Sequence, residues 1–290
     1  MGNVPGTWTV VRVTLREGLR RRLLLALGGL SLVAVLITAW GYAQLPNLPA
    51  GSSGPLTTPQ IQLLASQLLI LVMFMFGFVL ALAAVFAAAP SVAGELESGE
   101  MLAVLARPVP RRSILIGKWL ALAIVVVVYA VVATSLEYLA VGTTTGYLPP
   151  HPLDASLYLA GEGLVILALT MALSTRLSPV TAGIVAMLCF GLAWLGGVVG
   201  GIGSAFADPV TAQLGTVTRL LLPTDGLWRG AIFSLEPSAV VLAGNSAGPQ
   251  FAAFPFYASA PPSLAYLGWS AAWVVGTLAL AVVSFGRRDL

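Results

Sequence analysis

The stretch from Ile61 to Ala89 reads IQLLASQLLILVMFMFGFVLALAAVFAAA and contains no charged side chain. A helix needs about 20 apolar residues to cross a hydrocarbon core, so this stretch is longer than one crossing requires. An island from Glu95 to Lys118 follows it and holds seven charged residues, three acidic and four basic. This alternation predicts a membrane span that leads into a water-exposed loop.

The composition of the whole chain agrees with a membrane location. The 290 residues are 58% hydrophobic and 9% charged, with a mean hydropathy of +0.94. Soluble globular domains carry about a quarter charged residues, so this class is excluded. The net charge of +3 comes from localised arginines and indicates orientation and contact with anionic lipid, with no nucleic acid partner. We predict an all-α polytopic membrane protein with a single transmembrane domain over residues 1–290.

Six stretches are long enough to span a membrane. They are Leu23–Tyr42, Ile61–Ala89, Trp119–Val141, Leu157–Leu173, Val180–Ile202 and Leu264–Phe285. The fourth is short and contains Glu162. The fifth is preceded by Ser178 and Pro179, a capping side chain followed by proline at the first helical position.

Basic residues predict the orientation of these spans. If both termini are cytoplasmic, 12 of the 14 Lys and Arg residues lie in cytoplasmic segments and only Arg219 and Arg229 lie outside. The cytoplasmic set is Arg12, Arg16, Arg20, Arg21, Arg22, Arg107, Arg111, Arg112, Lys118, Arg176, Arg287 and Arg288. The first span follows three arginines, as a signal peptide would, but its apolar run is long for one.

Residues 1–22 precede the first span and are amphipathic. Their apolar stripe is Trp8, Val11, Leu15 and Leu19, and a second stripe carries Arg12, Arg16 and Arg20. This pattern is typical of an elbow helix that lies at the membrane interface. Such a helix could be a plain topological anchor or could contact a partner directly.

The segment 203–262 is too long for a turn and is predicted to be external. Its first half, Ala205–Leu235, contains two helix-like apolar runs broken at Pro223–Gly226, which predicts two short helices. The rest, Glu236–Pro262, is rich in Gly, Pro, Ser and Ala and lacks regular periodicity. The segment fits a lid over the spans or a substrate gate.

The island between the second and third spans, residues 90–118, has the pattern of a short helix. Its apolar side chains stand at helical spacing, acids crowd its amino-terminal turns, and Pro108 and Pro110 end it. A charged loop between spans is most often only solvated surface. Further residues are therefore needed to assign it a role.

Three motifs resemble the permeases of ABC-2 type transporters. The first is Glu-x-x-Ser-Gly-Glu-Met-Leu, then Arg-Pro-Val-Pro-Arg and Ile-x-x-Gly-Lys, across Glu95–Lys118. The second, Leu222–Arg229, looks like the "Asn-Pro-Thr-Asp" segment of permeases close to that of the nitrous-oxide reductase maturation system, with Leu222 where asparagine is common. The third is the basic end Phe285–Leu290.

The resemblance implies an exporter permease in the bacterial or archaeal cytoplasmic membrane. Two copies of the permease, or two related permeases, would sit on two ATPase subunits, and ATP and Mg would bind to those partners, because this chain contains no phosphate-binding Gly-x-x-x-x-Gly-Lys-Ser/Thr loop. No cofactor is expected in the chain itself. A coupling helix in the 95–112 loop would contact the ATPase through Glu95, Glu97, Gly99, Glu100, Met101, Leu102, Leu105, Arg107, Pro108, Arg111 and Arg112.

Other residues suggest a dimer contact and a substrate path. Gly196, Gly197, Gly200 and Gly201 form overlapping Gly-x-x-x-Gly steps, which favour close helix packing either between subunits or within one. Glu137 and Glu162 are acids within or near spans, where a carboxyl is costly, so each faces a substrate path or makes a structural hydrogen bond.

Two other function classes compete with the permease. An ion-coupled secondary transporter could use Glu137 and Glu162, although the sequence shows no repeated halves. An intramembrane enzyme finds little support, because one histidine, His151, and one cysteine, Cys189, supply neither a metal site nor a catalytic dyad. We therefore predict no catalytic and no metal-binding residues.

Overall fold

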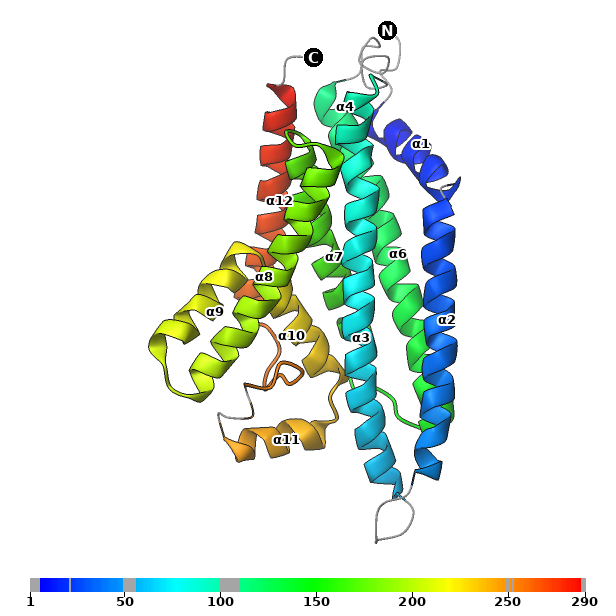
Figure 1. Ribbon diagram of the computed structural model, residues 1–290, viewed down its shortest axis with the longest axis vertical. Coiled ribbons are helices and arrows are strands. Elements are labelled where there is room, and N and C mark those ends of the chain that lie inside the picture. The colour runs from blue at the N-terminus through cyan, green and yellow to red at the C-terminus, as the bar shows by residue number, and fades with distance from the viewer. Residues whose placement is uncertain are drawn as a thin grey trace.

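The structure is a computed structural model that describes residues 6–20, 22–48, 56–99, 110–248, 251 and 253–287. Every regular element in these ranges is helical (Figure 1). Six helices are long and apolar enough to cross a membrane. They are α2 (Arg22–Gln44), α3 (Thr58–Ala89), α6 (Arg111–Thr145), α7 (Pro152–Ser174), α8 (Pro179–Ala205) and α12 (Leu264–Gly286). The predicted fold class and the six predicted spans are confirmed.

Local sequence signals account for the helix ends. Ser178 accepts a hydrogen bond from the Thr181 backbone N–H and caps α8, as predicted. The main difference from the prediction lies in α6 and α7, which begin well before their apolar cores. Pro110 and Pro152 explain this, because a proline at or next to the first helical position starts a helix without losing a hydrogen bond.

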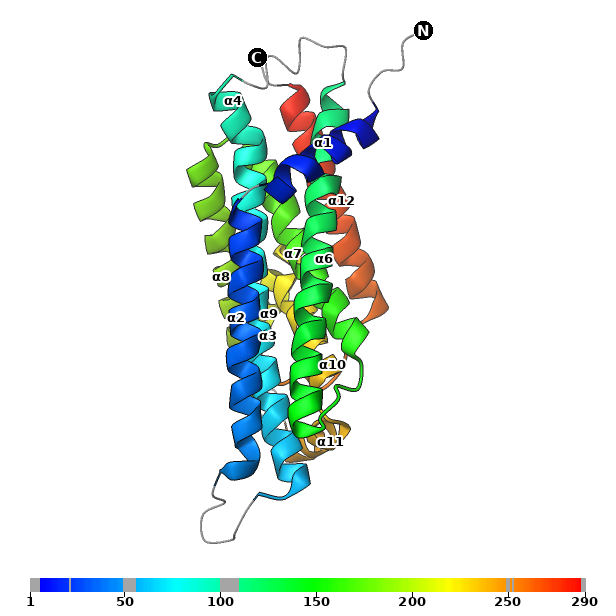
Figure 2. The ribbon, with the colours of Figure 1, turned by 90° about the vertical axis from the view of Figure 1, so that its right-hand side faces the viewer.

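α7 is the central helix of the bundle and packs against α3, α6, α10 and α12. α2 runs along α6, and α8 runs along α3 on the other side of the bundle (Figures 1 and 2). The start of α1 and the end of α12 lie at the same end of the molecule, which we call the terminal end. The lateral surface carries many exposed large apolar side chains, as lipid contact requires.

α1 (Thr7–Arg20) lies across the terminal end of α6 (Figure 2). Val11 is buried, whereas Trp8, Arg12 and Arg16 are exposed. The Arg20 side chain lies outside the described part of the structure. The helix matches the predicted elbow in position, and its location at a membrane interface stays a prediction.

α3 does not stop at Pro90 but continues into a π-helix, η3 (Pro90–Gly94), and a single turn, α4 (Glu95–Glu97). Gly99 follows with a φ of +77°, the left-handed conformation that suits glycine after a helix end. Residues 100–109, which would hold the predicted coupling helix, lie outside the described residues.

The segment that follows α8 lies beside the middle of the bundle and extends toward its opposite end (Figure 1). α9 (Pro209–Leu221) packs along α8, and α10 (Thr224–Leu235) turns back against α7, so the predicted pair of short helices and the break near Pro223 are confirmed. A further helix, α11 (Ser238–Ala247), lies in the part of the segment whose sequence lacks regular periodicity. Tertiary contact explains the helix: the Tyr257 hydroxyl donates to the Val241 carbonyl and its ring packs on Gly244.

Candidate functional site

The predicted ATPase-contacting residues are only partly described. Glu97 and Arg112 are exposed at the terminal end. Arg111 donates from Nη1 to the carbonyl of Gly286 at the end of α12, over 3.3 Å. Glu100, Met101, Leu102, Leu105, Arg107 and Pro108 lie outside the described residues. The role of this loop in contacting a partner therefore stays a prediction.

Glu95 does not face solvent freely, because its carboxylate forms an ion pair with Lys118. Lys118 is 7% exposed, and its Nζ also donates to the Ser91 carbonyl over 2.6 Å. We call Lys118, Ser91 and Glu95 the lysine clamp. The clamp joins α6 to the π-helix at the base of the loop. Glu95 and Lys118 belong to one charged island in the sequence, but nothing in their spacing predicts this contact.

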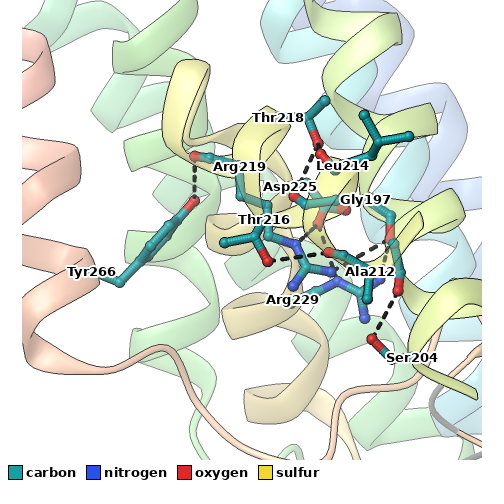
Figure 3. A network of polar contacts seen from close by, with 12 residues as sticks. Gly197, Ser204, Ala212, Leu214, Thr216, Thr218, Arg219, Asp225, Arg229 and Tyr266 are labelled. Carbon is teal, nitrogen blue, oxygen red and sulfur yellow. Dashed lines mark hydrogen bonds and ion pairs between the residues drawn. The ribbon is translucent and has the colours of Figure 1, made fainter. Parts of the chain in front are cut away.

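A second buried charge group joins α8, α9 and α10 (Figure 3). The Nε atoms of Arg219 and Arg229 lie 2.7 Å and 3.1 Å from Oδ2 of Asp225, and both guanidinium groups also donate to the carbonyl of Gly197. The Asp225 side chain is 2% exposed. We call Arg219, Asp225, Arg229 and the Gly197 carbonyl the arginine cluster.

Two aromatic side chains of α12 donate hydrogen bonds to the last turn of α9, next to the arginine cluster. The Tyr266 hydroxyl donates to the Arg219 carbonyl over 3.3 Å, and the Trp269 indole N–H donates to the Leu220 carbonyl over 3.0 Å. Both carbonyls belong to the last turn of α9, where helix carbonyls lack partners within the helix. The cluster is thereby connected to α12, the last of the membrane-spanning helices.

The glycines proposed for dimer packing have partners within this chain. A Cβ atom on Gly197 would lie 2.1 Å from the Asp225 carboxyl carbon, and one on Gly200 would lie 2.5 Å from the Cα of Gly215 in α9. Gly196 faces Thr218, and Gly201 is buried. The absence of side chains at Gly196 and Gly200 thus permits close α8–α9 packing, and the absence of one at Gly197 makes room for the Asp225 carboxylate of α10. A role of these glycines in a permease dimer stays a prediction.

Glu137 and Glu162 occupy separate surroundings. Glu137 is fully buried in α6, and its Oε2 accepts a hydrogen bond from Thr38 of α2 over 3.0 Å. Glu162 of α7 lies against Gly77 of α3, where a Cβ would come within 3.1 Å of its Oε2. One carboxyl oxygen of each residue is buried without a hydrogen-bond partner among the described residues. Each acid could bind a proton. In the described part of the chain, the two acids share no hydrogen-bond partner.

An apolar groove of about 610 Å³ lies between α3 and α8. Its lining includes Phe78, Phe86, Ile184 and Met187, and no charged side chain contributes to it. Pro90 and Pro179, at the terminal ends of the two helices, also line the groove. Such a surface suits a lipophilic molecule or an acyl chain.

The described residues contain no group of three His, Cys, Asp or Glu side chains that could hold a metal ion.

Two comparisons with known proteins place the chain. A family model described as "ABC-2 family transporter protein" matches residues 8–290. The chain is also 29% identical over 185 residues to a curated protein of Pseudomonas aeruginosa, "Probable ABC transporter permease protein NosY". That match covers 60% of this chain and 62% of the relative, less than two thirds of its length. Because the family model matches nearly the whole sequence, this chain belongs to the ABC-2 transporter family.

Proposed function

We propose that the chain is the membrane permease subunit of an ABC exporter whose ATP hydrolysis takes place on separate ATPase subunits. The match of the family model across residues 8–290 carries this proposal. The six spans supply the membrane pathway, and the partly described loop after α4 supplies a surface at the terminal end for the partner. A pair of such permeases on two ATPases, in the bacterial or archaeal cytoplasmic membrane, is the assembly we expect.

Lipophilic cargo is favoured by the groove between α3 and α8. It is apolar throughout its lining and open to the lateral surface. A lipophilic molecule could enter it from the bilayer without losing hydration. Export as the direction of transport is part of the proposal, as is the cytoplasmic location of the terminal end.

Labelling of single cysteines tests the orientation. In a Cys189→Ser background, a cysteine at Thr143, which is exposed at the far end of α6, should react with an impermeant reagent in intact cells. A cysteine at Ser98, exposed beside α4, should react only after the membrane is permeabilised. The reverse pattern contradicts the proposed topology.

Charge reversal in the loop tests the partner. Glu97→Arg combined with Glu100→Arg should leave membrane insertion intact but reduce co-purification with a co-expressed ATPase, because complementary charge guides such contacts. The control is Asp154→Arg, which reverses a 60% exposed charge in the first turn of α7, away from the terminal end. Wild-type ATPase binding by the double variant contradicts the proposed contact.

An ion-coupled secondary transporter is the second candidate, because Glu137 and Glu162 each keep a buried oxygen without a partner among the described residues. Protons moving along such acids would drive uptake or export without ATP. Transport by purified permease in vesicles with a proton gradient and no ATPase would establish this function. Strict dependence on ATPase and ATP would exclude it.

A further inference from the structure

We propose that Lys118 is the residue that transmits movement of the 95–112 loop to α6, through the lysine clamp. This inference rests on the proposed function, in which a partner ATPase moves the loop. It concerns a positioning residue, since Lys118 is buried and would not touch the ATPase itself.

The π-helix makes a backbone carbonyl available to the clamp. In a regular α-helix, the N–H of Glu95 would bind the carbonyl of Ser91. Here the Glu95 N–H binds the Val92 carbonyl instead, and the Lys118 ammonium takes the Ser91 carbonyl. Pro90 begins this segment and supplies no N–H of its own. The interruption in the helix is therefore held by a side chain from another helix.

The surroundings of Lys118 make the contact specific. A buried ammonium is tolerated only where a carboxylate and hydrogen-bond acceptors compensate it. The Glu95 carboxylate supplies the charge and Ser91 supplies an acceptor, both from the segment that leads into the loop. If the loop moved away alone, it would leave a buried charge without a partner, so movement of α4 is energetically coupled to movement of α6.

The neighbouring residue connects the clamp to the first helix. A Cβ on Gly117 would lie 2.7 Å from the Cβ of Val10 and 3.0 Å from the Thr7 carbonyl, so α1 crosses α6 at the position before Lys118. On the other side, Gly94 of the π-helix lies beside Pro179, at the start of α8. The clamp thus stands where α1, α6, α8 and the base of the loop meet.

Distance measurements between spin labels separate transmission from simple anchoring. In a Cys189→Ser background, one label pair at the exposed residues Ser98 and Arg287 reports on the loop, and another at Thr143 and Leu264 reports on the far ends of α6 and α12. Labelled permease is diluted with unlabelled copies and measured in complex with its ATPase, without nucleotide and with ATP and vanadate. In permease that retains Lys118, the distance within each label pair should differ between the two nucleotide states.

Lys118→Met should preserve the nucleotide response of the loop pair and abolish that of the far pair, whereas Lys118→Arg should retain both. A far pair that still responds in Lys118→Met overturns the transmission role. If the loop pair does not respond even with Lys118 present, the proposed function itself fails.

Hydrogen exchange of the permease alone tests the clamp without an ATPase. In Lys118→Met, amides of residues 91–98 should exchange at least about tenfold faster, because the carbonyl and carboxylate partners lose their shared cation. The matched control is Arg287→Met, which removes an exposed positive charge from the same end. Exchange in Lys118→Met that equals the control would show that the clamp does not hold the segment, and would overturn the proposal.

Discussion

Two regions of the molecule, the lysine clamp and the arginine cluster, both use buried charge to join helices, but they use it differently. At the terminal end, one lysine holds a single carboxylate and a carbonyl that a π-helix has released. Where α8, α9 and α10 meet, two arginines share Asp225, and Gly196, Gly200 and Gly215 allow α8 and α9 to pack closely beside it. A hydrogen bond to a carbonyl of an interrupted helix can be replaced by one to another donor. A closely packed cluster, in contrast, cannot rearrange without losing several contacts at once. We therefore expect the lysine clamp to be the movable contact and the arginine cluster the rigid one.

The largest expected effect is the loss of charge in the arginine cluster. Asp225→Asn leaves two arginines without their carboxylate, and breaking a buried pair costs about 3–5 kcal/mol. Arg219 is 30% exposed, which brings the expected loss in the free energy of unfolding to about 3 kcal/mol. Thermal unfolding in detergent measures it. Asp208→Asn is the control, since Asp208 is an exposed N-cap and asparagine caps equally well. Equal stability of the two variants would contradict the expected rigidity of the arginine cluster.

Close packing between α8 and α9 provides the next test. Gly200→Ala forces the two backbones apart, because its Cβ would lie 2.5 Å from the Cα of Gly215. Overpacking of this kind costs roughly 1–3 kcal/mol. Gly191→Ala in the same helix has open space around its Cβ and should not destabilise the protein. A loss of dimer without a loss of monomer stability in Gly200→Ala would instead favour the subunit contact predicted from the sequence.

A buried acid makes the opposite end sensitive to pH. Glu236 is 1% exposed between α10 and α11, and burial raises its pKa from 4.5 to about 8. Between these values the folded protein keeps a proton that the unfolded chain releases, so stability is greatest below pH 4.5, falls as pH rises and levels off above pH 8. We expect a loss on the order of 3 kcal/mol from pH 5 to pH 8. Melting curves of Glu236→Gln should lack this component; an unchanged slope would contradict the assignment.

The smallest effect is expected at the π-helix that begins at Pro90. Pro90→Ala restores a backbone N–H that can bind the preceding turn and should raise the free energy of unfolding by less than about 1 kcal/mol. Circular dichroism and thermal unfolding detect the gain. Pro46→Ala in η1, a short helix (Leu45–Asn47) at the opposite end, is a control for proline removal outside the π-helix. A marked loss of stability in Pro90→Ala would show that the π-helix is a rigid element, as the arginine cluster is.

The sequence predicted the elements that depend on local composition and failed where distant residues meet. The six spans follow from long apolar runs, and the break at Pro223 follows from turn residues. The arginine cluster was missed because Arg219 and Asp225 stand on different helices, and only the reversal between α9 and α10 brings them together. The spacing of Asp225 and Arg229, one helical turn apart, was a signal that could have suggested the pair.

The clamp was missed for the same reason. Lys118 and Ser91 are 27 residues apart, on either side of the loop, and no periodicity relates them. α11 was missed because it lies in a segment without regular periodicity, and the helix depends on contact with Tyr257. In each case, tertiary packing determined what local sequence could not.

The π-helix at Pro90 has a mechanical consequence. On one side of the π-helix, α3 is a helix of 32 residues, roughly 48 Å long. On the other side, α4 is a single turn. Rotation of α3 by about 5° about this pivot would displace its far end by about 4 Å, a leverage that follows from helix length alone. Because Pro90 also lines the apolar groove, the pivot is part of the groove wall. A change of angle at this residue therefore alters the width of the groove directly, with no intermediate element.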